Sequence, residues 1–125
     1  MKSINFKKNF KEYVVNGDES KIIRVKLSPD MLDKIDNTLS EIDKIRDEIN
    51  KDNIARMGRK YGEIINNIFD TDICTPAFDG ENPFSVVDGG KLLVEAFFEA
   101  FIPILEEDMK SLKLRPEVQK YLEKS

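Results

Sequence analysis

The sequence contains no histidine, and this absence excludes several kinds of functional site. A Ser-His-Asp triad, a Cys-His pair, a His-ligated zinc site and a histidine pH switch all need an imidazole. The single cysteine, Cys74, cannot form a disulfide within the chain, which fits a reducing compartment. No histidine can activate this thiol, and its acidic neighbours raise a thiol pKa. We therefore expect a protein that is not an enzyme and that uses no cofactor.

A long uninterrupted apolar run is also missing. The first ten residues, MKSINFKKNF, contain no apolar core of a secretory signal. The most apolar segment, VDGGKLLVEAFFEAFIPIL over residues 87–105, is interrupted by Glu95 and Glu99. A membrane span needs about twenty predominantly apolar residues, so this segment is too short. We expect no membrane contact and a cytoplasmic protein.

The formal net charge of −4 is unevenly distributed. Residues 1–27 carry seven Lys/Arg and three Asp/Glu, whereas residues 70–108 carry ten Asp/Glu and one lysine, Lys91. An acidic centre repels phosphates, so we do not expect nucleic acid as a partner. The basic N-terminus is interpreted as a solvated hairpin edge protected by lysines. An arm that contacts RNA or DNA is the alternative.

The pattern predicts one domain over residues 1–125, mainly α with an N-terminal β-hairpin, so a small α+β fold. Residues 1–27 form the hairpin region, because Asn16-Gly17 favours a turn and Ile23, Val25 and Leu27 alternate with basic residues. The segment Ile4-Asn5-Phe6 is a candidate for a short third strand.

Residues 28–69 are predicted to be amphipathic helices. Ser28-Pro29-Asp30 is typical of a helix start, and isoleucines and leucines then recur every three or four residues. The apolar stripe shifts between Ile49 and Ile54, so one bent helix and two helices both fit. Residues 70–84 are predicted to be an acidic loop. Residues 85–125 are predicted to contain a Phe-rich helix from Ser85 to about Lys113, then a short helix over 115–121.

Three specific chemical interpretations fit the sequence less well than simpler structural ones. Gly89-Gly90-Lys91 departs from the phosphate-binding loop pattern, since Ser85 stands at its first glycine and Leu92 at its hydroxyl. The carboxylates of Glu95 and Glu99 share a helix face, but a solvated acidic stripe is the simpler interpretation. The acidic loop could form an irregular calcium site, but a solvated loop is the simpler interpretation. The acids in question are Asp70, Asp72, Asp79, Glu81 and Asp88.

The Phe-rich helix has more apolar circumference than one-sided packing requires, which is roughly 100°. At the helical angle its apolar residues divide into two adjacent sets. Either the hairpin and the Ile-rich helices cover both sets, or the second set meets another chain. We take the second option as the prediction for partner binding. The first set is Leu93, Ala96, Phe97, Ala100 and Ile104; the predicted partner-binding set is Val94, Phe98, Phe101 and Leu105.

Three segments, taken in order, resemble one known family. They are YGEIINNIFD (61–70), AFDGENPF (77–84) and KLLVEAFFEAF (91–101). Together with the hairpin and the charged tail, this layout resembles the small tail assembly chaperones of phages that infect Gram-positive bacteria, over residues 28–113. The resemblance implies a mostly helical protein of the host cytoplasm. It also implies binding to the tape-measure protein, which such chaperones keep soluble while tail protein polymerises around it.

Two other classes remain open. The first is a structural or oligomerisation module, such as a minor virion component, in which the second phenylalanine set pairs with a copy of itself. The second is a small regulatory protein-binding module. The sequence thus predicts a protein partner, with a homo-oligomer as an alternative.

Overall fold

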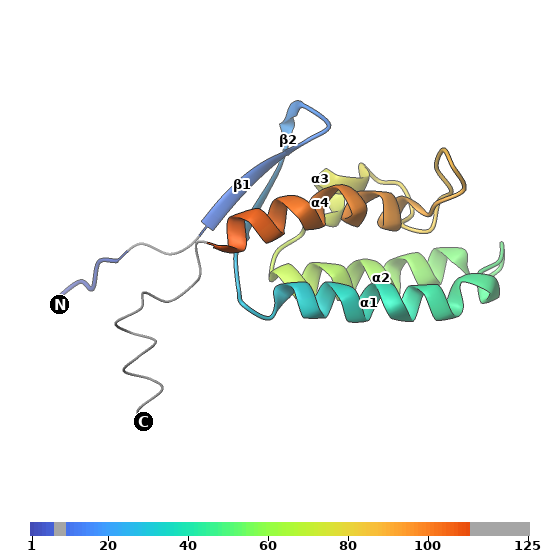
Figure 1. The fold of residues 1–125 in the computed structure, drawn as a ribbon, viewed down its shortest axis with the longest axis horizontal. Coiled ribbons are helices and arrows are strands. Elements are labelled where there is room, and N and C mark those ends of the chain that lie inside the picture. Colours follow the sequence, from blue (N-terminus) through green and yellow to red (C-terminus); the bar gives the residue numbers. More distant parts are fainter. Residues whose placement is uncertain (7–9, 111–125) are drawn as a thin grey trace, which may run out of the picture.

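A computed structural model of the chain describes residues 1–6 and 10–110. It is a small α+β domain in which an N-terminal antiparallel hairpin is followed by helices, which confirms the predicted fold class (Figure 1). The short helix predicted over residues 115–121 lies outside the described residues. The elements in chain order are β1 (Phe10–Val15), β2 (Asp18–Lys26), α1 (Met31–Ile45), the 3₁₀ turn η1 (Arg46–Glu48), α2 (Ile54–Phe69), α3 (Cys74–Phe78) and α4 (Leu93–Met109).

The hairpin closes with a two-residue turn at Asn16-Gly17. Both residues have positive φ, 51° and 71°, which asparagine and glycine tolerate best. β2 therefore begins at Asp18, directly after this turn. The ladder runs antiparallel from the Phe10–Lys26 pair to the Val14–Ile22 pair. The alternation in β2 is confirmed: Ile23, Val25 and the following Leu27 are buried, and their charged neighbours are exposed.

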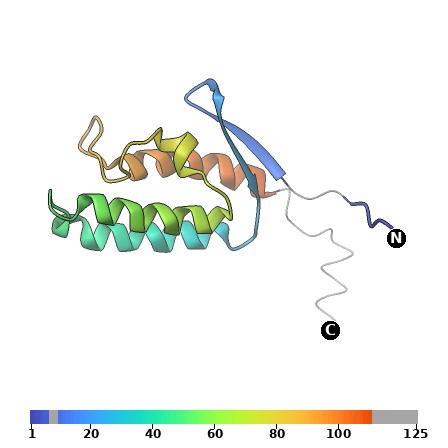
Figure 2. The same ribbon diagram turned by 180° about the vertical axis from the view of Figure 1, so that it is seen from behind.

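Residues 28–69 form two helices, which decides between the two readings of the shifted stripe. α1 and α2 lie side by side as an antiparallel pair in both views (Figures 1 and 2). The turn between them is held by asparagines: Nδ2 of Asn53 donates to the Glu48 carbonyl at 2.9 Å, and the Asp52 amide donates to Oδ1 of Asn50 at 2.8 Å. These local bonds compete with helix continuation, so the chain reverses there. α1 begins at Met31, just after the predicted Ser28-Pro29-Asp30 start.

The acidic segment 70–84 is not loop throughout, because it contains the short helix α3. The carboxylate of Asp72 accepts from the amide and the hydroxyl of Thr75, at 3.1 and 2.6 Å. The side-chain oxygen of Asn66 accepts from the amides of Ile73 and Cys74, at 2.9 and 3.1 Å. Side chains thus satisfy the first amides of α3, a role that polar residues commonly fill at helix starts.

The Phe-rich helix begins at Leu93, not at Ser85 as predicted from the sequence. Residues 87–91 instead form a tight reversal, in which the Val87 amide donates to the Lys91 carbonyl at 2.8 Å. Gly89 and Gly90 make this reversal with φ of 87° and 78°, a conformation that other residues rarely adopt. The helix start is capped by Glu95, whose Oε1 accepts from the Leu92 amide at 3.0 Å.

α4 is the centre of the fold. It lies along the α1–α2 pair, and the hairpin stands over its C-terminal half (Figures 1 and 2). Side chains from every layer meet on it, and burying them supplies the main driving force for folding. The buried core includes Ile23, Val25, Met31, Ile35, Ile42, Tyr61, Ile65, Phe69, Phe84, Val94, Phe98, Phe101 and Leu105.

Candidate functional site

The four residues predicted to bind a partner are buried inside the single chain. Val94, Phe98, Phe101 and Leu105 expose between 0 and 5% of their surface. The expectation that these four side chains are open to a partner is therefore wrong. The physical reason is that α4 is covered on two sides, which was the alternative left open by the sequence.

Aromatic contacts show what covers this face of α4. The ring of Phe69, at the end of α2, stacks on Phe98 and Phe101 with centroid distances of 6.3 and 5.9 Å. From the hairpin, Tyr13 meets Phe101 edge to face at 5.0 Å. The Tyr13 hydroxyl also donates to Oδ2 of Asp108 at 2.7 Å. Contacts of this kind stabilise a core beyond the area that they bury.

The apolar surface that remains open belongs to the first set of α4, which the sequence analysis assigned to the core. Phe97, Ala100 and Ile104 line a groove of about 210 Å³ between α4 and β1. Val14 and Ile104 are about half exposed, at 50% and 49%. The remaining lining comes from Tyr13, Val15, Asn16, Ile23 and Phe101. We call this feature the β1–α4 groove.

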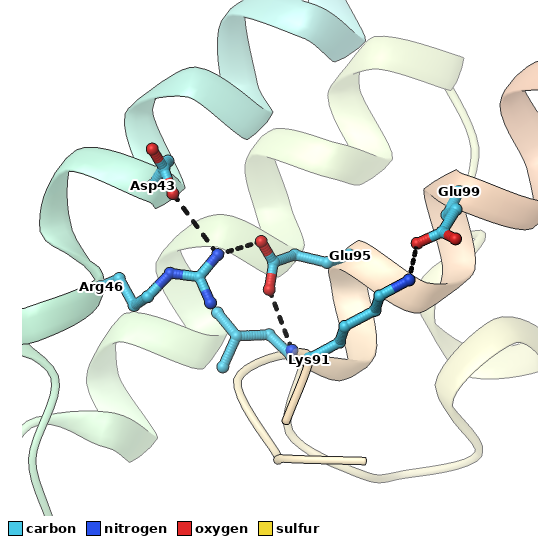
Figure 3. Close-up of polar contacts among 6 residues, drawn as sticks. Asp43, Arg46, Lys91, Glu95 and Glu99 are labelled. Atoms are coloured by element: carbon cyan, nitrogen blue, oxygen red, sulfur yellow. Dashed lines mark hydrogen bonds and ion pairs between the residues drawn. The ribbon is translucent and has the colours of Figure 1, made fainter. Parts of the chain in front are cut away.

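The carboxylates of Glu95 and Glu99 each have a cation of their own. Arg46, from η1, pairs with Glu95 and with Asp43, whereas Lys91 pairs with Glu99 (Figure 3). The hydrogen bond to Glu95 is the main cause that raises the pKa of Arg46 above its ordinary value. Because each carboxylate is neutralised separately, the two do not form an acid–base pair, and the Arg46–Glu95 contact ties η1 to α4.

The acidic loop and Cys74 are likewise engaged in structure. Hydrogen bonds from Thr75 hold the pKa of Asp72 below its ordinary value, and Asp79 pairs with Lys21 at 2.7 Å. In residues 1–6 and 10–110, no three His, Cys, Asp or Glu side chains gather closely enough to hold a metal ion. Burial, with a smaller effect of Asp72, raises the pKa of the Cys74 thiol to about 11. A thiol with so high a pKa is a poor nucleophile near neutral pH.

A larger hollow of about 770 Å³ lies where β2, the start of α1 and the end of α2 meet. Its lining alternates in sign. Lys34 pairs with Asp30 at 3.2 Å, and Arg24 pairs with Glu12 at 3.6 Å. A wide surface basin lined by charges of both signs selects no particular ligand charge. The β1–α4 groove is therefore the best candidate for a functional surface.

The sequence contained a signal for one wall of this groove. Helical spacing placed Phe97, Ala100 and Ile104 together, but spacing alone does not say which face a distant hairpin covers. Val14 carried a weaker signal, as an apolar residue on the outward face of β1, opposite Ile22.

Within the part of the chain that the structure describes, no helix is long and apolar enough to cross a membrane. Comparison of the chain with protein-family models, curated proteins and solved structures finds no match. The resemblance to tail assembly chaperones therefore rests only on the segments quoted above, and the groove is the main physical guide to function.

Proposed function

We propose that the protein is a phage tail assembly chaperone of the host cytoplasm, which binds apolar segments of the tape-measure protein and keeps them soluble. The β1–α4 groove is the observation that carries this proposal. The resemblance of the quoted segments supplies the client. The binding residues of the proposal are Val14, Phe97, Ala100 and Ile104, in place of the buried set.

The groove offers a modest amount of binding energy. Burying a whole valine or isoleucine side chain contributes about 1.5–3 kcal/mol. Covering the half-exposed Val14 and Ile104 therefore contributes about 2 kcal/mol before the cost of ordering the partner. Phe97 and Ala100 add contact area between them. This size suits reversible contact with a short stretch of client, as a chaperone that leaves its client requires.

Charge indicates which apolar segments fit. Lys91 and Lys110 pair with Glu99 and Glu107, but residues 91–110 still carry five acidic residues against these two lysines. Opposite charges favour encounter and select partners across an interface. We therefore expect client segments in which lysines or arginines flank apolar residues.

Ile104→Asp is the variant that tests the groove. It places a charge where the client docks, at a side chain that is already half exposed, so the fold should persist. Val86→Asp is the matched control, because Val86 is 71% exposed and is not part of the groove lining. Phe98→Asp is unsuitable, since a charge inside the core would unfold the domain.

The measurement is co-purification of each variant with fragments of the tape-measure protein that the proposal assigns as the client, after circular dichroism shows that the variants are folded. We expect the original chain and Val86→Asp to retain the fragment, and Ile104→Asp to lose it. If folded Ile104→Asp binds as well as the original chain, the groove is not the client site. If the original chain binds no fragment, the chaperone proposal itself is wrong.

A further inference from the structure

The two-stranded sheet has an open edge beside the β1–α4 groove. Among the residues that the structure describes, β1 pairs only with β2. Four consecutive residues, Tyr13 to Asn16, line the groove. Side chains alternate between faces along a strand, so a consecutive lining means that the groove follows the edge of β1 and not one of its faces. A further strand laid there would pair with this edge and cover Ala100 and Ile104.

The N-terminal arm, residues 1–6, has the character of such a strand. Ile4 and Phe6 expose 86% and 71% of their surface, so the chain's own core buries neither of them. They are two positions apart, so in a strand both side chains face the same way, about 6.6 Å apart. Ala100 and Ile104 are four positions apart on α4, about 6 Å along the helix. The spacings match.

Chain connectivity keeps Ile4 and Phe6 from reaching the groove of their own chain. An antiparallel turn after Phe6 would place Ile4 and Phe6 beside Glu12 and Phe10, at the opposite end of β1 from the groove, and only Met1–Ser3 would lie beside Tyr13–Val15. Parallel pairing needs a crossover of a dozen or more residues, and far fewer separate the arm from β1. A second copy of the chain is free of both restrictions.

Charge also favours this pairing. Residues 1–11 contain four lysines and no acidic residue. Residues 91–110, which include α4, carry five acidic residues and two lysines, and these lysines pair with Glu99 and Glu107. An arm that is basic and apolar at alternate positions therefore complements an acidic helix beside an apolar groove.

We propose that residues 1–6 of one copy add as a strand to the edge of β1 in a second copy, with Ile4 and Phe6 over Ala100 and Ile104. Adding a strand to an open edge is a common mode of protein recognition. This inference uses the groove of the proposed function, so the arm of a second copy and the client exclude one another. Self-association then shields the groove until a client displaces the arm.

Cysteine pairs placed in separate chains test this contact. A chain with Phe6→Cys is mixed with a chain with Ile104→Cys, both in a Cys74→Ala background, under mild oxidation. We expect a disulfide-linked heterodimer to form several-fold faster than in the control mixture of Phe6→Cys with Val86→Cys. Equal rates in the two mixtures would overturn the proposal. A disulfide within one dilute chain that carries both Phe6→Cys and Ile104→Cys would overturn it as well.

The mass in solution is the second measurement. Light scattering over a range of concentrations should show association of the full chain, and a single-chain mass for both Ile104→Asp and a chain that lacks residues 1–6. A full chain that stays monomeric throughout contradicts the inference. The shortened chain should bind tape-measure fragments at least as tightly as the full chain. If shortening leaves the mass unchanged while Ile104→Asp still loses client binding, the inference about the arm is refuted and the proposed function stands.

Discussion

Replacing Gly58 with alanine tests how α2 is joined to the loop before α4. Gly58 is a buried residue of α2, and a Cβ at this position would lie 2.3 Å from Nδ2 and 2.6 Å from Cγ of Asn82. Asn82 cannot move freely, because its Nδ2 donates to the Ile54 carbonyl at 2.9 Å and its Oδ1 accepts from the Phe84 amide at 2.9 Å. A methyl group at Gly58 must therefore break these bonds.

Two opposing effects decide the sign of the change. Alanine is preferred over glycine within a helix by about 1 kcal/mol. The two hydrogen bonds of Asn82 contribute about 1 kcal/mol each, and forcing a methyl group into a packed site costs about 1–3 kcal/mol. The losses exceed the gain, so we expect Gly58→Ala to lower the free energy of unfolding by about 2 kcal/mol. For a domain of this size that lowers Tm by roughly 8 °C.

Removing the Asn82 side chain should reverse the sign of the stability change caused by Gly58→Ala. In an Asn82→Ala background the obstructing amide is gone, so Gly58→Ala should there stabilise the protein by about 0.5–1 kcal/mol. Gly62→Ala is the control on the same helix. Its Cβ would meet only Sγ of Cys74, at an ordinary 3.8 Å, so it should stabilise by a similar amount. Urea unfolding followed by circular dichroism measures all four variants. If Gly58→Ala stabilises the original chain, the contact with Asn82 is not as described.

Three further predictions concern polar contacts and Cys74. Arg46→Ala should lower the free energy of unfolding by about 1 kcal/mol and Lys91→Ala by less than about 0.5 kcal/mol, because Lys91 and its partner are the more exposed pair; equal effects in urea unfolding would contradict the tie to α4. Burial, with the Asp108 hydrogen bond, raises the pKa of Tyr13, so its contribution is complete below about pH 10 and is lost above that pH. The original chain should therefore lose more stability between pH 8 and 11 than Tyr13→Phe does, and identical pH profiles would exclude this. Cys74, with a pKa of about 11 against an ordinary 9.0, should react with a thiol reagent about a hundredfold more slowly in the folded chain than in urea.

Local features of the fold could be predicted from the sequence because their causes are local. Asn16-Gly17 specifies its own turn, and the alternation of Ile23 and Val25 with charged residues specifies the buried face of β2. The predicted start of the Phe-rich helix at Ser85 was wrong because of another local feature. Residues 85–88 fit the pattern of a helix cap. Gly89 and Gly90 favour a chain reversal, and the chain reverses there instead of starting the helix.

The candidate functional surface could not be predicted in the same way, because its exposure depends on residues distant in the chain. Phe98 and Phe101 are covered by Phe69 from α2 and by Tyr13 from β1. A helical projection shows that α4 has two apolar faces, but it cannot show which one the hairpin leaves partly open. The groove beside Ile104 lies between α4 and β1, and both elements are needed to form it.

The small size of the groove has a consequence for how a chaperone of this kind would work. A hollow of about 210 Å³ accepts a few side chains, so one copy should hold one client segment only weakly. A tape-measure protein with many apolar segments can engage many copies at once, each released singly as tail protein advances. Weak contact at each site and many sites along the client together give solubility without permanent capture. The proposed arm of a second copy would bind with the same weakness, so it would shield the groove and still yield it to a client.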